Sequence, residues 1–142
     1  MANRPDLFPQ TQTRRGTGGV RADIGIYVRS GWEANYARYL NFLKTAGDII
    51  DWKFEPKTFE FEGIKRGSRF YTPDFLVTWK NGRSEYHEVK GYMDQRSATK
   101  LKRMKKYHPE VVVVLIDSKH YRGIAKSMRG LIPHWEGRIQ ND

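Results

Sequence analysis

The sequence predicts a single α/β domain in which a mixed β-sheet, centred on one hairpin, is flanked by helices. A chain of 142 residues can bury one hydrophobic core but not two independent ones. Its hydrophobic content of 38%, with 13% aromatic residues, is typical of a folded protein rather than a disordered tail. Helix-like and strand-like patterns alternate along the chain, and Asn81-Gly82 separates two strand-like runs, which is a strong signal for a hairpin.

The first 22 residues predict a flexible basic arm. They contain prolines, glycines and four arginines, and they show neither a helical nor a strand period. Arg14 and Arg15 within this arm are candidate contacts to phosphate groups. We expect the folded domain to comprise residues 23–142.

The first predicted helix covers residues 31–46. Ser30 with Glu33 three positions later fits a capping box. Apolar side chains recur at helical spacing from Trp32 to Leu43. Gly47 follows as a stop signal, so we expect the helix to end there.

Four strand-like segments follow this helix. Residues 49–61 alternate before Pro56 and again after it, which predicts two short strands or one long strand broken at the proline. Residues 65–69, KRGSR, predict a loop. Residues 70–79 and 83–92 then form the two arms of the predicted hairpin.

Two helices and one strand are predicted in the last third of the chain. An apolar stripe from Ala98 to Tyr107, with most basic side chains off it, predicts a basic amphipathic helix over residues 95–107. Residues 110–117, EVVVVLID, form a continuous β-branched run that predicts a strand buried on both faces. A helix over residues 118–129 completes the order α, β, β, β, β, α, β, α.

The charge balance favours a polyanionic partner. There are 26 Lys and Arg residues against 16 Asp and Glu, which gives a formal charge of +10 and a pI near 9.9. We therefore expect a nucleic acid to be bound rather than a small neutral ligand. Beside the two arginines of the arm, the candidate DNA-contacting residues are Arg69, Lys100, Lys102, Arg103, Lys106, Lys119, Arg122 and Lys126.

Several classes of protein are excluded by composition. The chain has no cysteine, so it offers neither a disulfide framework nor a cysteine zinc site. It has no run of about 18 apolar residues to cross a membrane, and its first residues lack the apolar core of a secretory signal. We expect an intracellular protein.

Charged residues gather on the predicted hairpin. Glu88 and Lys90 lie on one strand face because side chains alternate with a period of two. An exposed ion pair is one interpretation, and such pairs contribute only about 0 to 1 kcal/mol. Asp74 on the other arm favours a functional one, because strands disfavour Asp and Pro73 removes a ladder donor. Pairing through the turn can bring Asp74 close to Glu88.

This grouping suits metal-dependent phosphodiester hydrolysis. Neighbouring carboxylates repel unless a cation lies between them, and their oxygens suit Mg²⁺ or Mn²⁺. The acids would hold the metal, while Lys90 would orient the nucleophile or stabilise charge on phosphorus. Glu33 is a candidate third acid. Its two interpretations, capping partner of Ser30 and member of the site, have equal weight from the residues alone.

The same residues resemble a known nuclease signature. Pro73-Asp74, thirteen further residues and then Glu88-Val89-Lys90 resemble the PD-(D/E)xK motif, and Glu33 matches the helix glutamate often found upstream. The ordered stretches RSGWE, YTPDFL, EVKGY and YHPEVVVVLI, within about residues 28–117, resemble the phage endonuclease I family of Holliday-junction resolvases.

The resemblance implies a restriction-endonuclease-like fold and an active site. The implied catalytic residues are Glu33, Asp74, Glu88 and Lys90. The implied metal ligands are Asp74, Glu88 and the backbone carbonyl of Val89, with Glu33 as a further candidate. Two features depart from the family and bear on junction selectivity: the charge-rich turn KNGRSEY, and the C-terminal stretch GLIPHWEGRIQND, which lacks a strongly basic tail.

The resemblance also implies a homodimer. The family exchanges strands across a bridge, and here FEPKTFEFEG, residues 54–63, is the segment that could cross. In such a strand-swapped dimer each site takes Glu33 from one chain and Asp74, Glu88 and Lys90 from the other.

We therefore expect a Mg²⁺-dependent DNA endonuclease acting on branched DNA, located in the cytoplasm of a bacterial host if it is phage-encoded. A sequence-specific or nicking endonuclease of the same fold is one alternative. A non-catalytic DNA-binding module is a second. The acid pair of Asp74 and Glu88 argues against the latter, because carboxylates on a DNA-binding face repel the phosphate backbone.

Overall fold

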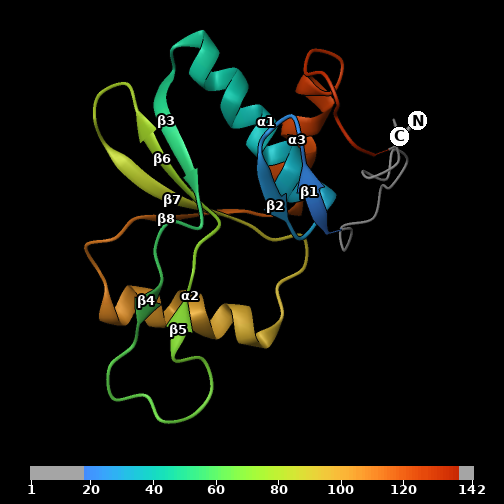
Figure 1. Cartoon of the computed structure of the whole chain (residues 1–142). Coiled ribbons are helices and arrows are strands. Elements are labelled where there is room, and N and C mark those ends of the chain that lie inside the picture. The colour runs from blue at the N-terminus through green and yellow to red at the C-terminus, as the bar shows by residue number, and fades with distance from the viewer. Residues whose placement is uncertain (1–17, 138–142) are drawn as a thin grey trace.

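The computed structural model describes residues 18–137, which form a mixed α/β protein (Figure 1). The helices in this range are α1 (Gly31–Ala46), α2 (Gln95–Tyr107) and α3 (Ser118–Met128). The predicted α/β class is confirmed, and the limits of all three helices agree with the prediction to within one residue. Arg14 and Arg15, with the rest of the arm up to residue 17, lie outside the described residues.

The central sheet has four strands in the order β3-β6-β7-β8. Their bounds are β3 (Ile49–Phe54), β6 (Phe75–Trp79), β7 (Ser84–Val89) and β8 (Val113–Ile116). The first three pair antiparallel, whereas β8 pairs parallel with β7. A parallel pair needs a long crossover, and α2 provides it. The predicted mixed sheet is therefore confirmed.

The hairpin between β6 and β7 turns at Asn81-Gly82, as predicted. Gly82 has a φ of 89°, a conformation that glycine adopts without strain. The backbone N–H of Gly82 donates to the carbonyl of Trp79 at 2.8 Å. The side-chain oxygen of Asn81 accepts from the N–H of Arg83 at 3.0 Å. These contacts fix the register of the two strands that carry the acid pair.

Two small sheets accompany the central one. β1 (Gly19–Arg21) pairs with β2 (Ile26–Val28), and β4 (Phe59–Glu60) pairs with β5 (Phe70–Tyr71). The strand β1 corrects the predicted arm, whose last residues are folded. Arg21 is buried and donates to both carboxylate oxygens of Glu136, at 2.6 and 2.9 Å. This buried ion pair anchors β1, the last part of the predicted arm, to the folded domain.

Asp74 lies just before a strand rather than in the middle of one. The predicted run of residues 70–79 is divided into β5 and β6 by Thr72-Pro73-Asp74. Proline cannot donate to a sheet ladder, so the pairing changes partner there. β5 pairs with β4, and β6 pairs with β3.

Two burial predictions are wrong. β8 was expected to be buried on both faces, but among its residues only Ile116 is buried. It is an edge strand, since β7 is its one neighbour in the sheet. Ala98 was expected on the inner stripe of α2, but it is exposed, because α2 packs through Leu101, Met104 and Tyr107.

One face of the central sheet packs against α1 and α3. The core there includes Leu40 of α1, Phe75 and Val77 of β6, and Ile116 of β8. Aromatic stacking joins the two helices. The ring of Trp32 lies 4.0 Å from that of Tyr121, with the planes 8° apart.

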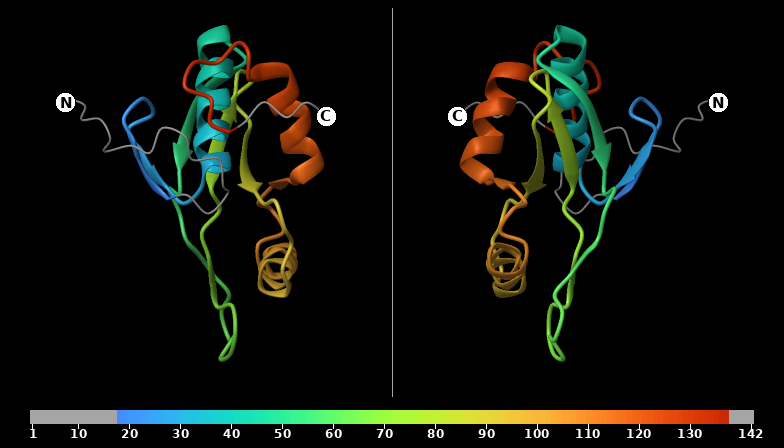
Figure 2. Two further views of the ribbon diagram at one scale, coloured as in Figure 1. Left: turned by 90° about the vertical axis from the view of Figure 1, so that its right-hand side faces the viewer. Right: turned by 90° about the vertical axis from the view of Figure 1, so that its left-hand side faces the viewer.

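A second apolar cluster joins α2 to β4 and β5. Its buried members are Phe59, Phe61, Tyr71 and Met104. The β4–β5 pair and α2 lie side by side beyond the end of the central sheet in two perpendicular directions of view (Figures 1 and 2). The described residues thus form two packed regions, one around each apolar cluster. No helix within residues 18–137 is long and apolar enough to span a membrane.

Candidate active site

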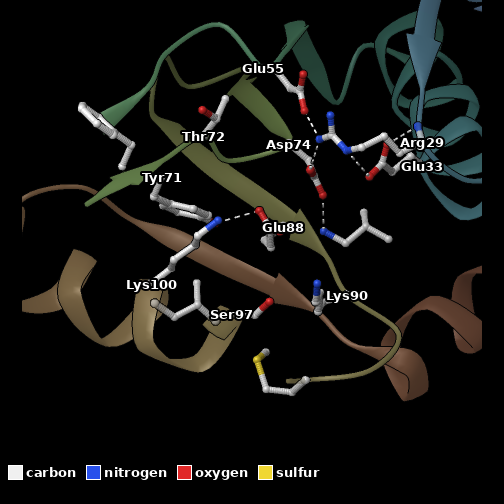
Figure 3. A pocket seen from close by; sticks show the side chains of 14 residues that line it. Arg29, Glu33, Glu55, Tyr71, Thr72, Asp74, Glu88, Lys90, Ser97 and Lys100 are labelled. Atoms are coloured by element: carbon white, nitrogen blue, oxygen red, sulfur yellow. Dashed lines mark hydrogen bonds and ion pairs between the residues drawn. The ribbon is translucent and has the colours of Figure 1, made fainter. Parts of the chain in front are cut away.

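The four residues of the nuclease signature line one cavity of about 530 Å³ between these two packed regions. Glu33 comes from the first turn of α1, Asp74 from the residue that precedes β6, Glu88 from β7, and Lys90 from the residue that follows β7. Their side chains converge from different elements (Figure 3). The prediction that the hairpin brings Asp74 to Glu88 is confirmed.

Asp74 is placed by the hairpin register and by the backbone around it. Phe75 pairs with His87, so Asp74 falls opposite Glu88. The N–H of Val89 donates to Oδ2 of Asp74 at 2.9 Å. Only 3% of Asp74 is exposed, and its burial, with the charges of Glu88 and Glu33, raises the pKa of its carboxyl well above the usual value.

Glu88 is held by a tyrosine of the neighbouring small sheet. The hydroxyl of Tyr71 donates to Oε1 of Glu88 at 2.7 Å. Burial raises the pKa of Glu88, while this hydrogen bond and the charge of Lys90 oppose the rise. Glu88 is thus oriented by a group on β5, although it belongs to the central sheet.

Glu33 combines the two interpretations that the sequence leaves open. Its N–H donates to Oγ of Ser30 at 3.1 Å, so Ser30 caps α1. Its carboxylate accepts from the backbone N–H of Arg29 at 2.9 Å, not from that of Ser30. The same carboxylate lines the cavity, and burial raises its pKa. Capping and membership of the site therefore coexist.

Lys90 extends the ladder beyond β7 and supplies a cation to the cavity. Its N–H donates to the carbonyl of Ile116 at 3.0 Å, which fixes the backbone next to β8. Its ammonium lies 3.9 Å from Oδ2 of Asp94. The positive charge lowers the pKa of Glu88 and of Glu33. Lys90 and Glu88 therefore interact electrostatically inside one cavity, as their strand spacing predicts.

Sequence reasoning missed several residues of this cavity. Arg29, Glu55 and Tyr71 all line it, and each contacts an acidic or basic partner there. Arg29 lies within the RSGWE stretch, which was a signal, although no role followed from it. Glu55 has a φ of 48°, unusual for a residue other than glycine, and its N–H donates to the carbonyl of Asp74 at 2.7 Å.

The donor set fits a hard divalent cation held by few protein ligands. No group of three or more His, Cys, Asp or Glu side chains within residues 18–137 is arranged to hold one ion. Asp74 and Glu88, with the carbonyl of Val89, could bind Mg²⁺ or Mn²⁺, which usually retain several waters in protein sites. Asp74 is buried, Glu88 is half-buried, and their carboxylates repel each other, so an ion that neutralises both would fit between them.

The predicted DNA-contacting residues of α2 lie near the cavity or on the exposed side of the helix. Lys100 lines the cavity and points into it from α2 (Figure 3). Lys102 and Lys106 are exposed. Arg103 instead donates to the carbonyl of Ser68 at 2.6 Å and ties the loop between β4 and β5 to the helix.

The remaining basic candidates are not part of the cavity lining. Arg69 pairs with Glu60 at 3.0 Å across the β4–β5 pair. Lys119, Arg122 and Lys126 are exposed on α3, which packs against α1 and lies apart from α2 (Figure 1). The predicted basic surface is thus divided between two regions of the molecule.

A single chain supplies the whole signature. Glu33 lies close enough to Asp74 for its charge to raise the pKa of Asp74. Residues 54–63, the segment that could cross to a second chain, run from β3 into the β4–β5 pair. The structure describes one chain, so an exchange of this segment between two chains stays a prediction.

Comparison with known proteins adds a family. The family described as "Protein of unknown function (DUF1064)" matches residues 20–123. The chain belongs to this family. The matched range of DUF1064 includes every residue that lines the cavity, from Arg29 to Leu101. Neither a curated protein nor a solved structure matches the chain.

Proposed function

We propose that this protein is a metal-dependent DNA endonuclease of the PD-(D/E)xK type, with a restriction-endonuclease-like core. One observation carries the proposal: Glu33, Asp74, Glu88 and Lys90 line one cavity. Glu33 and Asp74 are buried, Glu88 is half-buried, and the pKa values of all three acids are raised. Buried acids that repel one another are costly to a fold, so such clusters are concentrated at functional sites.

Each residue has a defined part in phosphodiester hydrolysis. Asp74, Glu88 and the carbonyl of Val89 would hold Mg²⁺ or Mn²⁺, and Tyr71 keeps Glu88 oriented through its hydrogen bond. A bound ion supplies polarisation of the scissile phosphate and a water of lowered pKa. Lys90 stabilises the negative charge that develops on the phosphate oxygens. Basic side chains of α2 bind neighbouring phosphates.

The favoured substrate is branched DNA, cut as by the phage-type junction resolvases that the sequence resembles. The apolar rim of the cavity supports this. Phe70 and Met93 line the cavity and are 51% and 37% exposed. An exposed aromatic side chain such as Phe70 can stack on a base that becomes unstacked when a branch point opens.

A dimer is proposed for the junction-cutting form, because two symmetry-related strands must be cut and each chain has one site. A nicking or sequence-specific endonuclease of the same fold is the second candidate. Its support is that one chain supplies Glu33, Asp74, Glu88 and Lys90 by itself. A DNA-binding module without catalysis is disfavoured by the buried acids, which repel phosphate.

The test is a cleavage assay with Mg²⁺ on a four-way junction, a duplex of the same sequence and a single strand. Preferential cutting of the junction supports the resolvase, whereas cutting of one duplex strand supports the nickase. Asp74→Asn is the inactive variant. Asp51→Asn is its control, because Asp51 lies on the exposed side of β3 and pairs with Lys44 at 3.0 Å. If the protein binds DNA but cleaves none of the three substrates, the result supports the non-catalytic DNA-binding module.

A further inference from the structure

Arg29 places a positive charge in the lining of the cavity. Arg29 lies immediately before the cap of α1, and its guanidinium reaches three carboxylates (Figure 3). It forms a hydrogen-bonded ion pair with Glu55. Its Nη2 lies 3.7 Å from Oδ1 of Asp74, and its Nε lies 4.0 Å from Oε2 of Glu33.

These contacts add to the neutralisation of acids that repel one another. The cavity is lined by four acidic residues, Glu33, Glu55, Asp74 and Glu88. Arg29 opposes the effect of burial on two of them, since its charge lowers the pKa of Glu33 and of Asp74. It therefore acts at the place where a divalent cation would have the same effect.

The two oxygens of Asp74 have different partners, and this makes the competition specific. Oδ2 accepts the N–H of Val89, while Oδ1 faces Arg29. The oxygen that remains for a metal ion is thus the one nearest the guanidinium. Arginine stays charged at all ordinary pH values and has no acceptor, so it cannot join a metal's ligands and would be repelled by the ion.

Arg29 can leave the acids when another cation replaces its charge. Its side chain is 57% exposed, so its guanidinium can return to water. The side chain of Asp74 is only 4% exposed and would be left without this counter-ion in the absence of a metal. The backbone N–H of Arg29 stays bonded to the carboxylate of Glu33 at 2.9 Å, so the side chain of Arg29 can turn outward without disturbing the start of α1.

We propose that Arg29 is an internal counter-ion that takes the place of the divalent cation beside Asp74, and that metal and guanidinium bind there in competition. The inference rests on the proposed metal site. It assigns Arg29 a positioning role: it stabilises the metal-free acids and yields Oδ1 of Asp74 when the ion arrives.

The test measures ion binding by calorimetry, with Ca²⁺ and Mg²⁺ as probes and no DNA present. Arg29→Gln should bind both ions more tightly than the wild type by roughly three- to tenfold, because the ion no longer displaces a guanidinium; this change corresponds to about 0.7 to 1.4 kcal/mol. Arg29→Lys keeps the charge and should bind nearly as the wild type does. Arg83→Gln is the control, because Arg83 is exposed in the hairpin turn, away from the cavity.

Thermal unfolding in EDTA gives a second reading. Arg29→Gln should melt at a lower temperature than the wild type. Added Ca²⁺ should raise the melting temperature of Arg29→Gln by more than it raises that of the wild type. If the wild type binds an ion and Arg29→Gln binds it no more tightly, the inference about Arg29 is wrong, while the proposed metal site stands. Failure of both proteins to bind either ion overturns the proposed metal site together with it.

Discussion

The backbone N–H of Val89 donates to Oδ2 of Asp74 across the gap between β7 and the start of β6, at 2.9 Å. This bond lies between the two charges of the EVK stretch and turns the peptide of Val89 toward the acid of the opposite strand. The other oxygen, Oδ1, lies 3.7 Å from Nη2 of Arg29. The two carboxylate oxygens of Asp74 thus have different partners, one a backbone N–H and the other a guanidinium.

The first prediction concerns the stability of the metal-free protein. An unfolded Asp ionises near pH 3.8, whereas folded Asp74 ionises at higher pH. Between those pH values the folded state holds more protons, so stability falls as pH rises through that window. Asp74→Asn removes this penalty, and its amide oxygen can still accept from Val89. We expect a melting temperature in EDTA at pH 7 that is higher by a few degrees.

The control for this measurement is Asp51→Asn. Asp51 lies at the surface, and its hydrogen bond to Lys44 lowers its pKa, so its substitution should not stabilise the protein at neutral pH. A melting temperature for Asp74→Asn below that of the wild type at pH 7 would show that its charge is compensated without a metal.

The second prediction concerns the cofactor. Cleavage should require Mg²⁺ or Mn²⁺ and should stop in excess EDTA, because the acids need a cation to bind the scissile phosphate. Ca²⁺ should permit DNA binding without efficient turnover. The measurement is a cleavage time course beside a gel-shift titration. Undiminished cutting in EDTA contradicts the proposed site.

The third prediction separates chemistry from binding. Asp74→Ala, Glu88→Ala and Lys90→Ala should each lower the cleavage rate by about 10² or more, since each removes a metal ligand or a charge-stabilising group. DNA affinity should change much less, because basic residues of α2 provide the grip. Single-turnover rates and equilibrium binding measure the two effects. A Lys90→Ala protein that cuts at the wild-type rate would exclude the mechanism.

The helices and the hairpin follow from local rules. Ser30 and Gly47 mark the ends of α1, and Asn81-Gly82 forms the turn, because capping and turn geometry depend on neighbouring residues. The meeting of Asp74 and Glu88 follows from that turn and the strand period. Local sequence patterns therefore predict the side of the site that the hairpin forms, with Asp74 and Glu88.

The other side of the site comes from contacts between distant segments. Tyr71 reaches Glu88 because β5 pairs with β4 and not with the central sheet. Arg29 reaches Glu55 across 26 positions of the chain. The wrong expectation for β8 has the same origin, since a run of β-branched residues does not reveal that its strand lies at an edge.

The fourth prediction concerns the basic surfaces. Affinity for duplex DNA should fall with salt at a log-log slope of about −0.9 for each phosphate neutralised. Lys102→Glu with Lys106→Glu should flatten that slope, because both side chains are exposed on α2, the helix that lines the cavity. Arg103 is left intact because it holds the β4–β5 loop.

The matched control reverses the same number of charges on α3. Lys119→Glu with Lys126→Glu should lower the affinity less and leave the slope near its wild-type value, since neither residue lines the cavity. Equal effects of the two pairs would mean that DNA contacts both helices.

The last prediction concerns whether each active site is built from one chain or from two. One chain brings Glu33 to Asp74 and Lys90. If a dimer keeps this arrangement, each site is complete within a single chain. Mixing inactive Glu33→Gln with inactive Lys90→Ala, under conditions that exchange subunits, should then yield only singly damaged sites and no recovered nicking. A site shared between chains would instead create heterodimers with one intact site and one doubly damaged site.

Tagged subunits verify the exchange, and sedimentation at the assay concentration reports the dimer. Recovered nicking would establish a strand-swapped form. A monomer that cuts only one strand would favour the nickase, because a junction needs two sites acting together.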